Sequence, residues 1–160
     1  MTVRSSQKGI TLVEVLLATA LTAVVVGGLS TAIFATVSAT GRGSDETSAL
    51  RDLQNAAHWI SRDAQMASTT NLTEGGEAID ALTLEWTDCQ ASSHSCSYTL
   101  SGSELQRNYD GNVSTVARYV STVEFSISGG VLTYSLESTP PGRWQVNRHM
   151  TGKVHLRPNG

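Results

Sequence analysis

The sequence has few charged side chains, few aromatic rings, three prolines and only two cysteines. Its 160 residues include 11 basic and 14 acidic side chains, a balance that excludes a strongly basic nucleic-acid-binding protein as the default interpretation. No proline occurs before Pro140, so no proline interrupts the N-terminal half. The length suits one domain with one anchoring element.

Signatures of catalysis and of cofactor binding are also missing. No serine lies in a nucleophile-elbow motif, and no glycine-rich phosphate loop occurs. The histidines form no metal-spaced pair on an expected helix; they are His58, His94, His149 and His155. We therefore expect a protein that is not an enzyme and that requires no cofactor.

The most informative segment is Lys8-Gly9-Ile10-Thr11-Leu12-Val13-Glu14, which opens a long apolar run. From Ile10 to Gly41 the only charged residue is Glu14. The run exceeds the roughly 20 residues that span a bilayer, and it is too long for the core of a secretory signal. Arg4 and Lys8 precede it, and positive flanks stay cytoplasmic, so we expect the C-terminal part outside the cytoplasm.

Glu14 is the first candidate functional residue. A carboxylate at the middle of a membrane helix costs roughly 2.5 to 3.5 kcal/mol, and such residues usually have a function and a partner. The alternative is an uncommon charged residue of a membrane helix without a specific role.

Residues 8 to 14 resemble the cleavage and methylation signature of type IV prepilins and type II secretion pseudopilins. The resemblance implies that a prepilin peptidase cuts between Gly9 and Ile10 and methylates the new amine of Ile10, where the family prefers phenylalanine. It further implies that Glu14 pairs with the Ile10 amine of a neighbouring subunit during assembly, which removes much of the cost of burying the charge.

The same resemblance implies a set of partners and a location. The partners are the prepilin peptidase, other pilin or pseudopilin subunits, an inner-membrane assembly platform and, before assembly, membrane lipid. The precursor would span the cytoplasmic (inner) membrane once, and the mature chain would join an extracytoplasmic or cell-surface filament. Residues 53–63 are similar to the corresponding helix of J-type minor pseudopilins and W-type minor pilins.

Residues 10 to about 68 are expected to form one long helix, after a leader of residues 1–9. Residues 10–41 would be the transmembrane or filament-core part, and residues 42–68 the amphipathic part. The spacing predicts one apolar face, formed by Leu50, Leu53, Ala57, Ile60, Ala64 and Ala67. The opposite, polar face is expected to hold most of Arg51, Asp52, Gln54, Arg62, Asp63 and Gln65.

Two places leave alternatives open within this helix. Residues 42–46 form either a helix break with Ser44 as the cap of a second helix, or a polar band in a continuous helix. Gly27-Gly28 is either a site of close helix packing or a point where the helix melts.

After residue 69 the composition becomes rich in Ser, Thr and Gly, and short alternating segments predict a β-rich head, residues 69–160. The expected strands are 79–86, 97–101, 104–109, 113–120, 122–128 and 131–137, with a final ribbon of 143–146 and 154–156. Gly129-Gly130 predicts a hairpin. A helix followed by antiparallel strands predicts a pilin-like α+β fold, with the helix packed on one antiparallel sheet.

Cys89 and Cys96 lie close in sequence, and an even number of cysteines in an extracytoplasmic domain predicts a disulfide. The alternative is a metal site of Cys89, His94 and Cys96, which lacks a clear fourth ligand.

Residues 138–160 are basic and contain no acidic residue; the cations are Arg143, Arg148, Lys153 and Arg157. We interpret them as a solvated edge or a subunit contact, and contact with DNA phosphates, as in a competence pilus, is the weaker alternative. Two other functions remain in competition with a filament subunit. One is a monomeric membrane-anchored binding module, and the other is an extracytoplasmic enzyme on a stalk.

Overall fold

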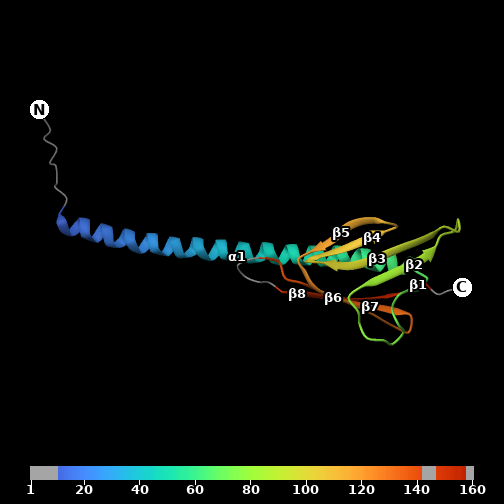
Figure 1. Ribbon diagram of the computed structural model, residues 1–160. Coiled ribbons are helices and arrows are strands. Elements are labelled where there is room, and N and C mark those ends of the chain that lie inside the picture. Colours follow the sequence, from blue (N-terminus) through green and yellow to red (C-terminus); the bar gives the residue numbers. More distant parts are fainter. Residues whose placement is uncertain (1–10, 142–146, 158–160) are drawn as a thin grey trace, which may run out of the picture. The chain divides into compact units, whose positions relative to one another are not determined.

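The computed structural model describes residues 11–141 and 147–157, and of Arg42 only the backbone. The chain forms two compact units, Met1–Gly41 and Arg42–Gly160. Within the described residues, one α-helix, α1 (Leu12–Met66), precedes eight strands (Figure 1). The strands are β1 (Thr69–Thr70), β2 (Leu82–Thr87), β3 (Ser93–Ser101), β4 (Glu104–Tyr109), β5 (Asn112–Arg118), β6 (Val120–Ser128), β7 (Val131–Ser138) and β8 (Arg148–His155).

The start of α1 carries its own capping signal. Thr11 Oγ1 accepts a hydrogen bond from the backbone N–H of Glu14 at 3.3 Å. A threonine followed three residues later by a glutamate forms the sequence of a capping box, which satisfies free N–H groups of a first turn. This local role of the Thr11–Glu14 pair was not predicted from the sequence.

The N-terminal part of α1 is apolar and also satisfies its own hydroxyl groups. Several side chains donate to the carbonyl four residues earlier; they are Thr22, Ser30, Thr31, Thr36 and Thr40. α1 is helical at Gly27-Gly28 and continues through residues 42–46. The continuous-helix interpretation of residues 42–46 is therefore the one that the structure supports.

In the unit of residues 42–160, α1 buries one face. Its fully buried residues are Ala49, Leu53, Ala56, Ile60, Asp63 and Ala64, and Ala67, directly after the helix, is also fully buried. The predicted apolar face is correct at Leu53, Ile60, Ala64 and Ala67, whereas Leu50 and Ala57 are only half-buried. The placement of Asp63 on the polar face was wrong, because its side chain has no exposed surface.

The strands form two antiparallel sheets where the sequence analysis expected one. A five-stranded sheet has the order β1-β2-β3-β4-β5, and a three-stranded sheet has the order β6-β7-β8. Both lie against the C-terminal part of α1 (Figure 1). The α+β fold with a helix packed on antiparallel strands is confirmed. The chain passes from the first sheet to the second at Tyr119, between β5 and β6. The strands expected to form a single sheet are therefore divided at this residue.

One apolar core joins α1 to both sheets. The largest fully buried side chains in it are Tyr98 from β3, Phe125 from β6 and Leu132 from β7. β4 has the predicted bounds, and β2, β3, β5, β6 and β7 overlap their predicted ranges. β1 was not predicted, and β8 begins at Arg148, earlier than the expected 154–156 segment. The other half of the predicted ribbon, residues 143–146, lies outside the described residues.

Candidate assembly site

The predicted processing residues Gly9 and Ile10 lie outside the described residues, as do Arg4 and Lys8. Glu14 is described, and it is exposed in the first turn of α1. The positive end of a helix dipole favours a carboxylate in that turn. Glu14 thus has a local stabilising role in addition to the pairing that the family resemblance implies.

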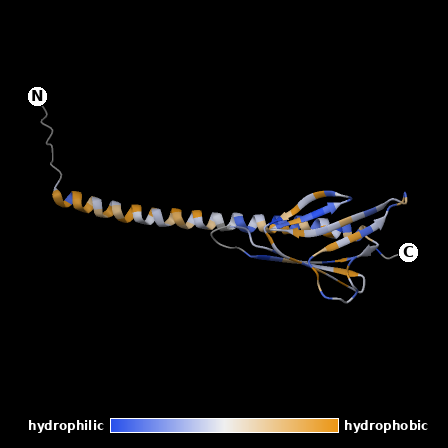
Figure 2. Cartoon of the chain, in the orientation of Figure 1, coloured by the Kyte–Doolittle hydropathy of each residue, from blue (hydrophilic) through white to orange (hydrophobic). Residues whose placement is uncertain are grey.

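The large apolar side chains in the N-terminal part of α1 are mostly exposed. The large ones from Leu12 to Val37 are between 50% (Val15) and 78% (Leu12) exposed. Figure 2 shows them as a hydrophobic band along the N-terminal part of α1. The segment is long and apolar enough to cross a membrane. So large an unburied apolar surface requires lipid or other helices around it.

The most elaborate polar cluster of the C-terminal unit surrounds Asp63. Arg107 of β4 donates from Nε to Asp63 Oδ2 at 2.6 Å and from a terminal nitrogen to Oδ1 at 2.9 Å. Tyr98 and Cys96 of β3 donate to the same Oδ2 atom, the thiol at 3.1 Å. Trp59 and Tyr109 each face the guanidinium of Arg107 at 4.8 Å. The cluster therefore fixes the register of α1 against β3 and β4.

These contacts change the pKa values of the buried groups. Burial alone would raise the pKa of Asp63, but hydrogen bonds from Arg107, Tyr98 and Cys96 outweigh it, so the pKa of Asp63 lies below its usual value. Burial and the neighbouring Asp63 carboxylate raise the pKa of the Cys96 thiol to about 12. Asp63 is therefore ionised and Cys96 is a neutral thiol at physiological pH. This cluster therefore stabilises the packing of α1 on the five-stranded sheet.

The sequence contained a spacing that indicates the burial of Asp63, but the predicted apolar face did not use it. Asp63 follows Ala56 by seven residues, which is almost two helical turns, and both are buried. The predicted apolar face included Ala57 and not Ala56, and this choice assigned Asp63 to the polar face. The partner, Arg107, could not be found from spacing because it comes from a distant strand.

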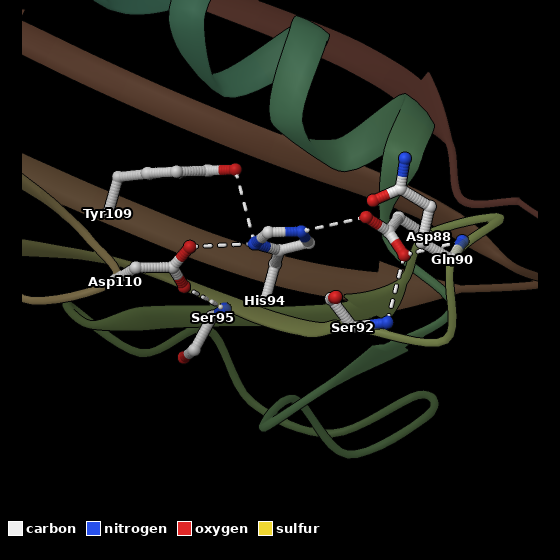
Figure 3. A network of polar contacts seen from close by, with 7 residues as sticks. All are labelled: Asp88, Gln90, Ser92, His94, Ser95, Tyr109 and Asp110. Atoms are coloured by element: carbon white, nitrogen blue, oxygen red, sulfur yellow. Dashed lines mark hydrogen bonds and ion pairs between the residues drawn. The ribbon is translucent and has the colours of Figure 1, made fainter.

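A second polar cluster lies at one end of the five-stranded sheet, around His94 of β3 (Figure 3). Its Nδ1 atom lies 2.7 Å from Asp110 Oδ2, and its Nε2 atom lies 3.5 Å from Asp88 Oδ2. The ring stacks on Tyr109, with centroids 5.9 Å apart. One imidazole thus connects the turn after β2 with the turn after β4.

Both carboxylates of this cluster are held in place by backbone groups. Asp88 accepts from the N–H of Gln90 and of Ser92, and Asp110 accepts from the N–H of Ser95, each at 2.8 Å. The hydrogen bond to Asp110 is the main cause that raises the pKa of His94. The pKa values of Asp88 and Asp110 are lowered, mainly by the Ser92 and the His94 hydrogen bond respectively.

The predicted disulfide is not present. Both Cys89 and Cys96 are free thiols, Cys89 exposed and Cys96 buried. The physical reason is the direction of the side chains, because Cys96 points inward to Asp63 while Cys89 belongs to the exposed turn between β2 and β3. In residues 11–141 and 147–157 no group of three or more His, Cys, Asp or Glu side chains could hold a metal ion.

The structure divides the basic residues of the C-terminal segment between two faces of β8. Arg148 is half-buried and forms an ion pair with Glu46 of α1. Lys153 is exposed and lies on the same face of β8 as the exposed His149 and His155, because alternate residues of a strand share a face. Arg157 is exposed beyond β8, and Arg143 lies outside the described residues. Arg148, Lys153 and Arg157 therefore do not share one face of the strand.

Comparison with known proteins gives one match, at the N-terminus. Residues 4–30 match the family described as the prokaryotic N-terminal methylation motif. Searches of curated proteins and of solved structures found no match. The motif implies processing by a prepilin peptidase and assembly with other pilins, and with the apolar helix it fits a precursor anchored in the inner membrane. The matched motif, followed by a long helix packed on antiparallel strands, supports a type IV prepilin-like family.

Proposed function

We propose that this chain is a structural subunit, a minor pilin or pseudopilin, of a type IV pilus or a type II secretion filament, and that it is not an enzyme. The observation that carries the proposal is the methylation motif of residues 4–30, which opens a helix whose large apolar side chains are mostly exposed. A filament core of bundled helices is one environment that buries such a surface. The membrane before assembly is the other.

The proposed assembly step depends on two charges. Cleavage after Gly9 creates a positively charged amine at Ile10, four residues before the carboxylate of Glu14. When helices of adjacent subunits bundle, Glu14 of one subunit pairs with the Ile10 amine of its neighbour. Each charge then removes much of the free-energy penalty for burying the other. If neighbouring helices are shifted along their axes by any other distance, both charges remain unpaired. The pair would therefore set the register of the filament.

Within the family, we propose the class of J-type minor pseudopilins and W-type minor pilins. The support is the similarity of residues 53–63 to the second half of the helix in those subunits. Such subunits occur in the complex that primes a filament or forms its tip. The C-terminal unit would then lie outside the cytoplasm, first at the inner membrane and afterwards in the filament.

A monomeric membrane-anchored binding module is the second candidate function. It requires neither cleavage nor Glu14. A DNA-contacting subunit of a competence pilus is a further variant, and the separation of Arg148 from Lys153 on β8 gives it little support.

The experiment that tests the proposal is an intact mass measurement on the chain from its native membranes, with and without the prepilin peptidase. We expect the loss of residues 1–9 and the gain of one methyl group only when the peptidase is present. An uncut Met1–Gly160 chain in both strains would contradict the proposal and would favour the anchored binding module.

A further inference from the structure

His94 lies between two carboxylates that come from different turns of the five-stranded sheet (Figure 3). Asp88 directly follows β2, and Asp110 directly follows β4. Asp110 is the closer of the two, at 2.7 Å from Nδ1, whereas Asp88 lies 3.5 Å from Nε2. Each ring nitrogen therefore has its own carboxylate partner.

The imidazole can donate to both carboxylates only in its charged form. The imidazolium has an N–H donor at each nitrogen, whereas the neutral ring has one donor and one acceptor lone pair. The single proton of the neutral ring stays on Nδ1, because the contact of that atom with Asp110 is the shorter one. Nε2 then presents its lone pair to the carboxylate of Asp88, and the hydrogen bond between them is lost.

The proton on His94 can exchange with solvent while the chain stays folded. The side chain of His94 is 24% exposed, and a hollow of about 420 Å³ lies beside it, lined also by Trp86 and Ser95. A histidine is the side chain whose charge ordinarily changes near neutral pH. The pKa of His94 is raised, mainly by the hydrogen bond to Asp110, so the change occurs above the ordinary value of 6.5.

Both carboxylates keep their charge over this pH range. The pKa values of Asp88 and Asp110 are lowered, mainly by the hydrogen bonds from Ser92 and from His94 respectively. The hydroxyl of Tyr109, on β4, lies 3.4 Å from Nδ1 of His94. Within the residues that the structure describes, these three side chains are the titratable groups that contact the imidazole.

Other charged groups on the surrounding elements do not replace the proton of His94. Arg107 of β4 lies 4.8 Å from the ring centroid of Tyr109 and is paired with Asp63 of α1. Glu85 of β2 pairs in register with Ser95, the residue after His94. Successive side chains of a strand point to opposite faces of the sheet, so Glu85 and His94 project from opposite faces.

The turn of residues 88–92, between β2 and β3, depends on the position of Asp88. The Oδ1 atom of Asp88 accepts from the backbone N–H groups of Gln90 and Ser92, each at 2.8 Å. Ala91 has a φ angle of 62°, in the left-handed region that residues with a side chain rarely adopt. Such a conformation persists only where the surroundings enforce it. The contact of Asp88 with His94 joins this turn to the rest of the sheet end.

The turn after β4 is attached independently of the charge on His94. Asp110 Oδ1 accepts from the N–H of Ser95 at 2.8 Å, and the N–H of Asp110 donates to the carbonyl of Ser95 at 3.0 Å. The neutral imidazole still donates from Nδ1 to Asp110. Loss of one proton therefore acts on the turn after β2 and not on the turn after β4.

We propose that His94 is a pH switch, in which loss of its proton releases Asp88 and loosens the turn of residues 88–92 while Asp110 remains bound. The exposed surface at this end of the sheet is then ordered at low pH and more mobile at high pH. The switch lies within the C-terminal unit and requires neither cleavage nor assembly, so it does not depend on the proposed function.

Hydrogen exchange of backbone amides in the full, detergent-solubilised chain tests the switch. An NMR titration locates the transition of His94, and exchange is then measured well below and well above it. We expect the protection factors of Gln90 and Ser92, corrected for the intrinsic effect of pH, to fall about two- to fivefold above the transition, the range for a partly exposed ion pair. The protection of Ser95 should not change, because this amide donates to Asp110.

Asp88→Asn should reverse the response. The amide keeps one oxygen for the N–H groups of Gln90 and Ser92, and it places an NH₂ donor in front of Nε2 of His94. Neutral His94 accepts this hydrogen bond, whereas the imidazolium cannot accept it. The protection of Gln90 and Ser92 should therefore rise with pH in this variant.

Two further variants show which histidine is responsible. His94→Gln removes the titrating group, so the protection of the turn should no longer depend on pH. His58→Gln, at an exposed position of α1, is the matched control and should keep the wild-type response.

The comparison of Ser92 with Ser95 uses the unmodified chain, so it is decisive even if a variant fails to fold. The inference would be overturned by a wild-type chain without the response or with equal changes at both amides. Persistence of the response in a folded His94→Gln chain would overturn it as well. An uncut chain in the mass measurement would contradict the filament subunit and leave the switch intact.

Discussion

The guanidinium of Arg107, on β4, donates two hydrogen bonds to the carboxylate of Asp63, which points from α1 into the core. The pair joins the helix to the five-stranded sheet in one orientation. Removal of the carboxylate would leave Arg107 without its counter-charge, and it would leave Tyr98 without the acceptor of its hydroxyl.

We therefore expect Asp63→Ala to lower the free energy of unfolding by about 3–5 kcal/mol, the cost of breaking a buried ion pair from one side. Denaturant unfolding of the detergent-solubilised chain measures this. Asp52→Ala, on the same helix, is the matched control and should cost no more than about 1 kcal/mol, since Asp52 is only half-buried. Equal effects of the two changes would contradict the role of Asp63.

The lowered pKa of Asp63 gives the pair a defined pH dependence. A carboxylate whose pKa is depressed in the folded state contributes stability above its unfolded value, near 3.8, and loses it as the pH falls through the folded value. Acid unfolding of the native chain should therefore become less steep in Asp63→Asn. A transition with the same slope in both proteins would show that Asp63 does not titrate on unfolding.

The His94 cluster should respond to pH in the opposite direction. Because the pKa of His94 is raised, its stabilising contribution is complete below its unfolded value, near 6.5, and is lost as the pH rises through the folded value. An NMR titration of the imidazole should give a pKa above 6.5, and Asp110→Asn should lower it. Asp88→Asn should lower it less, because Asp88 lies farther away, at 3.5 Å against 2.7 Å.

Gly152 is required by the ring of Tyr134, which pairs with it across β7 and β8. A Cβ atom on Gly152 would lie 2.1 Å from Cζ of Tyr134, and this ring also contacts Ser61 of α1 through its hydroxyl, at 3.1 Å. We expect Gly152→Ala to lower the free energy of unfolding by about 1–3 kcal/mol, the typical effect of overpacking. Gly111→Ala is the control for backbone strain without overpacking. An added Cβ at Gly111 meets no atom within 4 Å, but the φ angle of 88° is unfavourable for alanine.

The two thiols should differ sharply in reactivity. Cys89 is exposed, whereas Cys96 is buried and has a pKa raised to about 12. A maleimide should modify Cys89 in the native chain and Cys96 only after unfolding, because the thiolate is the reactive form. Mass spectrometry of the labelled chain checks this. Absence of labelling at both positions until a reductant is added would instead indicate a disulfide.

Glu14→Gln keeps a capping side chain at position 14 and removes its charge. Glutamine can still occupy the capping-box position, but it carries no charge for the Ile10 amine. We expect a chain that is cleaved and membrane-bound but enters filaments poorly, measured as the fraction in sheared filaments against the fraction in membranes. Gly9→Val should act earlier and leave an uncut precursor. Normal incorporation of the Glu14→Gln chain would contradict the pairing mechanism.

The sequence by itself determined the elements that depend on local pattern. The uninterrupted apolar run after Gly9 predicted the helix and its capacity to span a membrane, since only length and composition are needed for that. Alternation of apolar and polar residues predicted six of the strands, from 79–86 to 131–137, to within a few residues in most cases. The segment around Glu14 predicted the N-terminal methylation motif that the comparison matched, because it is read directly from consecutive residues.

Only the tertiary structure decided the contacts between residues that are distant in sequence. Asp63 could be buried because Arg107, from another strand, neutralises it, and no local pattern records that partner. Cys96 points to Asp63 and not to Cys89, because the direction of β3 in the sheet sets its side chain. The positive φ angle at Tyr119 marks the point where the chain leaves one sheet for the other, and the strand pairing that divides the sheets joins residues distant in sequence.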